Sequence, residues 1–341
     1  MTAEGDEHSA DHGRLDRPPP AHAFLDLPES FGRRFAIFVD TEEEFDWSQP
    51  TSRDRHGTSA AESLPKVHFR MREAGVKPVY LVDWPIANDI RCVPTLREFV
   101  ERGECAVGTH LHPWLNPPLE EELDRANSFA GNLPEALERA KLLRLTETIE
   151  NGIGRRPIVY RAGRYGVGPN TARLLAEAGY EADSSVRPLH DYSDEGGPDF
   201  TDFEPQPYRV GPLIELPLTV AYTGRLRRQG SRLYDRAGRI PRGRGLLART
   251  GLLNRIALTP EGIPLREAMD AVEQLLDDGL RFFSISFHSP TVEPGHTPYV
   301  RDLADLDTFY RWFDGMFNLF ARRAVAPAAL EEIVAAARAA P

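Results

Sequence analysis

The chain has 341 residues, of which 41% are hydrophobic, enough for the core of one large α/β domain or two ordinary domains. It carries 41 Lys and Arg against 52 Asp and Glu, a net charge of −11, so nucleic acid is not an expected partner. The first residues lack the basic start and apolar run of a signal peptide, and no apolar run is long enough for a membrane span. We therefore expect a cytoplasmic protein.

The start of the chain, residues 1–22, is polar and Pro-rich, which predicts a disordered tail before a single domain over 23–341. From Phe35 onward, short β-rich apolar runs alternate with helical patterns, as is typical of parallel strands joined by helices. The predicted strands are 35–40, 77–83, 104–110, 157–162, 180–185, 213–218 and 281–288. These seven units predict an α/β fold of the (β/α) barrel kind.

Three predicted helices cover 134–151, 264–278 and a late segment from about Leu306, so extra helices follow the last strand. The segment 222–260 breaks the alternation, because it carries ten arginines against the single acid Asp235. We expect an Arg-rich insertion that is either a helical cover over the barrel mouth or a basic amphipathic element. The second alternative would contact a membrane surface or the phosphates of a lipid-linked or phosphorylated sugar.

Polar and ionisable residues stand at the ends of all seven predicted strands. They are Asp40, Glu42, Asp83, His110, His112, Arg161, Arg164, Asp183, Glu215 and His288. Because the carboxyl ends of parallel barrel strands meet at one mouth, we expect these side chains to converge on an active site there.

Two short motifs give the strongest indication of chemistry. In VGTHLHPW, His110 and His112 are two residues apart, so an extended backbone directs both imidazoles to one side, where they can share a metal. In DTEEEFDW, the same period places Asp40 and Glu42 on one face, whereas Glu43 and Glu44 are expected in an acidic loop. The function of Asp46 stays open. The histidines expected in the tail or on the surface are His8, His12, His22, His56 and His68.

The cysteines, Cys92 and Cys105, have no metal-type spacing and are expected to be ordinary buried thiols.

These motifs, in this order, resemble the NodB-like polysaccharide deacetylases of the carbohydrate esterase family 4 type, in particular the WalW-type subgroup. The resemblance extends from about Phe35 to Arg322 and implies a distorted (β/α)7 barrel of the NodB-homology type. VDTEEEFDW is similar to the family's first motif, which implies Asp40 as catalytic base and Glu42 as metal ligand. His110 and His112 would be the other ligands, although the family's two histidines usually stand four residues apart.

Three further segments are similar to family motifs. In YRAGRYG, the resemblance implies that Arg161 orients the base, with Arg164 as the alternative, and that the backbone amide of Tyr165 stabilises the oxyanion. In EADSSV it implies that Asp183 tunes Arg161 or the catalytic histidine. In SISFHSP it implies that Phe287 lines the pocket and that His288 is the general acid.

The implied activity is a metal-dependent hydrolase that removes an N-acyl group, acetyl foremost, from a sugar or polysaccharide precursor. The implied cofactor is a divalent metal ion, zinc first, with cobalt, manganese or nickel as alternatives. Two other functions stay open. One is an inactive barrel that binds glycan or a partner protein, and the other is a metal hydrolase of a different amide or a phosphoester bond.

Overall fold

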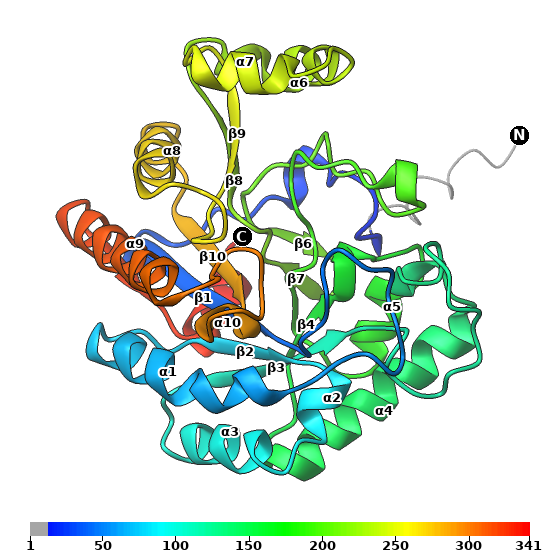
Figure 1. The fold of residues 1–341 in the computed structure, drawn as a ribbon. Coiled ribbons are helices and arrows are strands. Elements are labelled where there is room, and N and C mark those ends of the chain that lie inside the picture. The colour runs from blue at the N-terminus through cyan, green and yellow to red at the C-terminus, as the bar shows by residue number, and fades with distance from the viewer. Residues whose placement is uncertain (1–12) are drawn as a thin grey trace, which may run out of the picture.

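The computed structural model describes residues 13–341, and its centre is a curled sheet of parallel strands with helices outside it (Figure 1). The strands run in the order β10–β1–β2–β3–β4–β5–β7, and β6 pairs antiparallel with β7 at the edge. Their bounds are β1 Arg33–Thr41, β2 Val79–Val82, β3 Ala106–Leu111, β4 Val159–Ala162, β5 Ala182–Asp183, β6 Tyr208–Val210, β7 Leu213–Glu215 and β10 Phe282–His288. All seven predicted strands are present, and the predicted barrel is confirmed.

The helices of the barrel are α1 Leu64–Glu73, α2 Trp84–Ala87, α3 Cys92–Glu101, α4 Glu135–Ile153, α5 Thr171–Glu177, α8 Leu265–Asp277 and α9 Leu303–Arg322. The three predicted helices correspond to α4, α8 and α9. A short strand, β11 Val325–Pro327, then pairs with the amino end of β1, and α10 Leu330–Ala339 follows it. Leu330 and Ile333 of α10 belong to the same cluster as the side chains inside the barrel, so α10 closes the amino-terminal end.

Side chains on β1 alternate between the helix-covered side and the barrel interior. Ile37 and Val39 belong to the outer core, which the helices share, whereas Phe38 belongs to the interior cluster. Because a strand has a period of two, Asp40 and Glu42 continue the interior row beyond Phe38. The sequence thus places both carboxylates where the apolar filling of the barrel ends.

The described sheet ends at β10 on one side and at β6 on the other, so regular pairing does not close the barrel. Residues next to the insertion occupy the gap. The Ser284 amide on β10 donates to Thr219 Oγ1 at 2.8 Å, and the Ser286 amide donates to the carbonyl of Leu258 at 3.3 Å. These contacts bring Thr219 and Leu258 to the carboxyl end of β10, beside the predicted site.

The insertion forms an arm over residues 220–257. Strands β8 Val220–Thr223 and β9 Asn254–Ala257 make an antiparallel ribbon, which carries α6 Gly230–Gly238 and α7 Gly243–Arg249. In Figure 1 these two helices stand clear of the barrel, at the far end of the ribbon. No residue between 220 and 256 lines the cavity described below. The arm is therefore not the cover over the barrel mouth that one alternative predicted.

The predicted disordered tail is wrong for its described part, residues 13–22. Leu15 is fully buried and belongs to the outer hydrophobic core, and Arg14 pairs with Asp16 at 2.6 Å. The segment is polar in composition, but the burial of one leucine, Leu15, is enough to anchor it. The two histidines nearest the start, His8 and His12, lie outside the described residues.

Among the other histidines predicted to be on the surface, His22 and His56 are exposed, but the prediction for His68 is wrong. His68 is 3% exposed, its ring stacks on Phe99 at 3.7 Å, and its Nδ1 lies 3.0 Å from the Tyr80 hydroxyl. His68 lies on the face of α1 that packs against the core. A single polar residue in the sequence does not indicate such burial.

Cys92 is buried and Cys105 is half-buried, and both are free thiols. In the described part of the chain, no helix combines the length and apolarity needed to cross a bilayer.

Candidate metal and catalytic site

A cavity of about 870 Å³ opens at the carboxyl ends of the strands. Seven of the residues predicted for the site line it: Asp40, Glu42, His110, His112, Arg164, Tyr165 and His288. Aromatic side chains form much of the remaining wall: Phe45, Trp47, Trp114, Tyr192 and Tyr299. A concave, partly apolar wall with a few convergent polar groups is the usual form of a small-molecule site.

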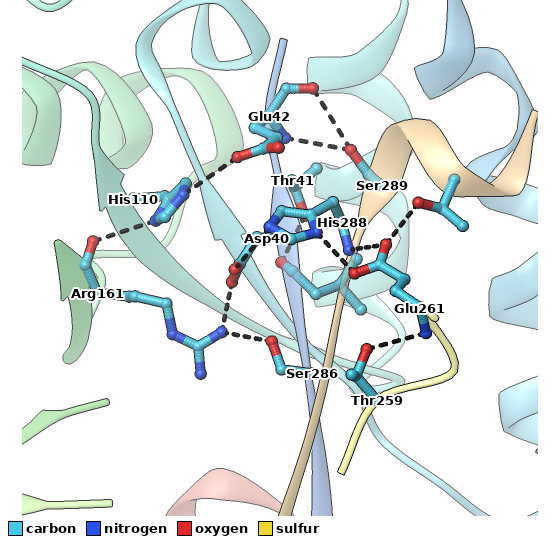
Figure 2. A network of polar contacts seen from close by, with 12 residues as sticks. Asp40, Thr41, Glu42, His110, Arg161, Thr259, Glu261, Ser286, His288 and Ser289 are labelled. Atoms are coloured by element: carbon cyan, nitrogen blue, oxygen red, sulfur yellow. Dashed lines mark hydrogen bonds and ion pairs between the residues drawn. The ribbon is translucent and has the colours of Figure 1, made fainter. Parts of the chain in front are cut away.

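Glu42, His110 and His112 form a compact buried triad. Glu42 Oε2 lies 3.3 Å from Nε2 of His110 and 3.4 Å from Nε2 of His112, and the two Nε2 atoms are 3.0 Å apart. All three side chains are at most 4% exposed. Figure 2 shows Glu42 directed towards His110 above the network around Asp40. The two-residue histidine spacing therefore brings both imidazoles to one point.

The hydrogen bonds on the far side of each ring leave Nε2 as the free acceptor. His110 Nδ1 donates to the carbonyl of Arg161 at 3.2 Å, and His112 Nδ1 donates to Glu43 Oε2 at 2.8 Å. Burial lowers the pKa of His110, and burial together with the charge of His110 lowers the pKa of His112 to about 4. Two neutral imidazoles therefore direct lone pairs at the same point, as metal ligands do.

The carboxylate of Glu42 also fits a cation at this point. Its Oε1 atom is buried and has no hydrogen-bond partner among the described residues. Burial, with a smaller contribution from the carboxylates of Asp40 and Asp83, raises the pKa of Glu42 to about 7, although His288 and His112 act to lower it. A bound cation would relieve both costs, since a buried carboxylate needs either a proton or a positive partner.

Glu43 and Asp83 support the triad from behind, and the expectation of Glu43 in an acidic loop is wrong. Glu43 is 1% exposed, accepts from His112, and donates its backbone amide to Asp83 Oδ2 at 2.8 Å. Asp83 also caps α2, because it accepts the amide of Ile86 at 2.9 Å. Burial raises the pKa of Glu43 to about 7 and that of Asp83 well above its usual value. These two carboxyls and His112 make a second cluster with metal-ligand spacing.

Asp40 makes a buried ion pair with Arg161. Nη1 of Arg161 lies 2.5 Å from Asp40 Oδ1, and the guanidinium also contacts Ser286 Oγ at 2.8 Å and the carbonyl of Ser184 at 2.8 Å. Burial alone would raise the pKa of Asp40, but Arg161 together with the two nearby histidines lowers it below its ordinary value. Asp40 is therefore an ionised carboxylate at neutral pH.

His288 is held on both sides by carboxylates, as Figure 2 shows. Its Nε2 lies 3.9 Å from Asp40 Oδ2, and its Nδ1 lies 2.7 Å from Glu261 Oε2. Glu261 is 8% exposed and also accepts the backbone amide of His288 at 3.0 Å and the hydroxyl of Thr291 at 2.5 Å. Burial lowers the pKa of His288, but Glu261 and the carboxylates of Glu42 and Asp40 raise it to about 10. His288 is therefore protonated at neutral pH.

The turn after β4 brings Tyr165 to the cavity. Arg164 and Tyr165 adopt positive φ angles of 55° and 62°, which non-glycine residues reach only with strain and which cluster at functional sites. Gly163 must lack a side chain, because a Cβ there would lie 2.4 Å from Cδ2 of His112. Arg164 also lines the cavity, but it pairs with Glu195 and covers the ring of Phe129 at 4.3 Å. Of the two predicted arginines, Arg161 is the one beside Asp40.

Asp183 and Phe287 do not reach the cavity. Side chains alternate between the two faces of a strand, and these two lie on the face directed away from the cavity. Asp183 is fully buried and bonds Ser185 Oγ at 2.7 Å, whereas its neighbour Ser184 contacts Arg161. Phe287 packs against Phe309 in the outer core, with ring centroids 5.3 Å apart, so the expectation that it lines the pocket is wrong.

Two other acids take structural positions. Glu215 pairs in register with Asp183 and accepts the Val186 amide at 3.0 Å, and the open case Asp46 is exposed and bonds Ser48.

Comparisons with solved structures show the fold alone. A protein from Mycobacterium smegmatis described as a presumed polysaccharide deacetylase is 20% identical over 95% of this chain and 96% of its own, with a TM-score of 0.51. A family 4 carbohydrate esterase from Streptomyces lividans in complex with acetate is 12% identical over 88% and 94%, with a TM-score of 0.42. A 4-alpha-glucanotransferase from Thermococcus litoralis is 12% identical over 89% and 40%, with a TM-score of 0.50.

No family model and no curated protein sequence matches this chain. The WalW-type subgroup therefore stays a prediction. The fold is the NodB-like (β/α) barrel of the carbohydrate esterase family 4 polysaccharide deacetylases.

Proposed function

We propose that this protein is a metal-dependent hydrolase that removes an N-acyl group, acetyl foremost, from a cytoplasmic sugar or polysaccharide precursor. One observation carries the proposal. A buried ligand triad of Glu42, His110 and His112 shares a cavity with an ionised carboxylate, Asp40, and a protonated imidazole, His288. Metal-assisted hydrolysis of an amide uses this combination of a cation site, a base and an acid.

Glu42, His110 and His112 would hold a divalent metal ion, zinc first, since two imidazoles and one carboxylate are a common hydrolytic set with an open position. Cobalt, manganese and nickel accept the same donors. When bound, such an ion would polarise the acyl carbonyl and bring the pKa of a water molecule towards neutrality.

The chain's own residues would move the protons. Asp40 would accept the proton of the attacking water at Oδ2, because Oδ1 is occupied by Arg161. Arg161 would keep Asp40 ionised, and the amide of Tyr165 would donate to the oxygen that gains charge. His288 would give its Nε2 proton to the departing sugar nitrogen, so that one proton is taken and one returned. Asp183, behind the site, would act only indirectly through the Ser184–Arg161 contact.

We predict acetate release from at least one member of a panel of N-acetylated sugars, measured with the zinc-loaded protein. Asp40→Asn should keep the metal but lower kcat by about a hundredfold or more, the usual effect of removing a positioned base. Asp46→Asn is the matched control, because this exposed carboxylate contacts only Ser48 in the same acidic segment.

Three outcomes would revise the proposal. Metal binding without acetate release from any sugar would favour an inactive glycan-binding barrel, and release of phosphate from model esters would favour a phosphoesterase. Parallel loss of metal and activity in Asp40→Asn would make Asp40 a ligand.

We predict that His110 and His112, replaced together by Ala, leave no bound metal in elemental analysis. Glu43→Gln should weaken metal affinity by about tenfold to a hundredfold, because the residue orients His112 through Nδ1. Glu44→Gln is the control, since Glu44 bonds Ser59 and His296 and has no contact with the triad. Unchanged metal content in the double histidine variant would exclude this site.

We predict that Glu261→Gln moves the alkaline limb of the kcat/KM profile to lower pH. The acid form of His288 exists below its pKa and is lost as pH rises through it, and Glu261 is the principal group that raises this pKa to about 10. Glu273→Gln, which removes a carboxylate that pairs with Arg323 on the surface of α8, should leave the limb in place. An alkaline limb that is the same in wild type and Glu261→Gln would show that His288 is not the acid.

The arm supports a second part of the proposal, contact with an anionic membrane surface. Eight of its arginines are exposed, namely Arg225, Arg228, Arg232, Arg236, Arg239, Arg242, Arg244 and Arg249, and none of them pairs with a carboxylate among the described residues. Two apolar side chains of the arm are also exposed, Ile240 to 62% and Leu246 to 64%. Exposed arginines around an apolar tip are typical of elements that lie on anionic lipid, and such a position would suit a lipid-linked sugar.

We predict that the protein sediments with phosphatidylglycerol vesicles at low salt and dissociates as salt is raised. Replacing Arg242, Arg244 and Arg249 by Gln should abolish sedimentation, whereas replacing the exposed Arg102, Arg311 and Arg338 by Gln removes equal charge elsewhere and should preserve it. Equal sedimentation of the two triple variants would exclude the arm as the contact.

A further inference from the structure

Three arginines line the cavity, and one of them differs from the other two. Arg125 and Arg164 both pair with Glu195. Arg187, in the segment that follows β5, has no carboxylate within ion-pair distance in the described part of the chain. The cavity wall thus contains a guanidinium whose charge no carboxylate of residues 13–341 balances by an ion pair.

The environment of Arg187 is formed by tyrosines. Its guanidinium lies over the ring of Tyr165, 5.0 Å from the centroid, and donates to the hydroxyl of Tyr192 at 3.1 Å. Its Nε atom is buried and has no hydrogen-bond partner among the described residues. A buried guanidinium donor without an acceptor costs free energy, which a ligand oxygen would recover.

Neighbouring groups make this side of the cavity more positive. Arg255 and Arg244 lie close enough to act, together with Arg187, on the pKa of His190, which burial and these three charges lower to about 2. Arg255 donates to the carbonyl of Leu189 at 2.5 Å and also lacks an ion pair in the described residues. His190 supplies no negative charge in either protonation state, and these arginines add positive charge beside Arg187.

Arg187 lines the same cavity as Asp40 and His288. Its guanidinium lies over the ring of Tyr165, which also lines this cavity. The charges of Arg187 and Asp40 both act on the pKa of the Tyr165 phenol. A ligand that places its acyl group at the triad would therefore extend past Tyr165 to Arg187.

We propose that the substrate is an N-acylated sugar bearing an anionic group, a carboxylate or a phosphate, and that Arg187 binds this group. The inference rests on the proposed function for the identity of the sugar, and it adds the charge of the substrate. A guanidinium suits both anions, because its planar donors match two oxygens at once. Arg187 would then determine specificity, while Asp40 and His288 carry out the reaction.

A purely structural role for Arg187 makes a different prediction. If its function were only to pack on Tyr165 and Tyr192, its loss would disturb every substrate in the same way. An anion site would affect only charged substrates and would leave the chemical step unchanged.

The kinetic test compares N-acetylglucosamine with two charged relatives, N-acetylglucosamine 6-phosphate and N-acetylmuramic acid. Wild type should prefer one charged sugar, which distinguishes phosphate from carboxylate. Arg187→Gln should raise KM for that sugar by at least about tenfold with little change in kcat, and should change KM for the neutral sugar less than about twofold. Arg322→Gln, at the exposed end of α9, is the control for lost charge. Equal effects on neutral and charged sugars, or no preference in wild type, would overturn the inference.

A binding test separates this inference from the proposed reaction. Calorimetry with the deacetylated products, glucosamine, glucosamine 6-phosphate and muramic acid, requires no turnover. Tighter binding of a charged product that is lost in Arg187→Gln supports the anion site even if no acetate is released. Equal binding of neutral and charged products by wild type overturns it, even if the protein proves to be a deacetylase.

Discussion

The rest of the site depends on the burial of the Arg161 guanidinium beside Asp40. Both side chains are almost completely buried, and their contact joins β4 to β1 across the barrel interior. A buried charge without its partner costs about 3 to 5 kcal/mol, so each residue requires the other. The pair keeps Asp40 ionised, and the carbonyl of the same Arg161 orients His110 towards Glu42. One residue of β4 therefore fixes both the base and a ligand.

The interior of the barrel mouth contains several buried acids, whose negative charge a cation would offset. Glu42, Glu43 and Asp83 are all buried, and burial raises the pKa of each of them. The histidines beside them are neutral, so they supply lone pairs and no charge. The fold alone does not provide this chemistry, since a glucanotransferase has a similar barrel. Hydrolysis would therefore depend on these particular side chains.

The strands could be predicted from the sequence. The residues whose position follows from the alternation of side chains along a strand could be predicted as well. The period of two placed Asp40 with Glu42 and His110 with His112, whereas His288 was predicted as the residue at the end of its strand. The same rule would have excluded Asp183, whose neighbour Ser184 holds the interior position. Glu43 and Glu261 could not be found this way, because their partners His112 and His288 lie 69 and 27 residues away along the chain. Leu15 and His68 were missed for a similar reason, since their burial depends on packing partners that local composition does not reveal.

The central claim is that a metal is held by Glu42, His110 and His112, and anomalous diffraction from crystals grown with zinc tests it most directly. Recorded on both sides of the zinc edge, the data should give one strong peak between Nε2 of His110, Nε2 of His112 and a carboxylate oxygen of Glu42. A peak instead within the second cluster, formed by Glu43, Asp83 and His112, or none at the barrel mouth, would contradict this account.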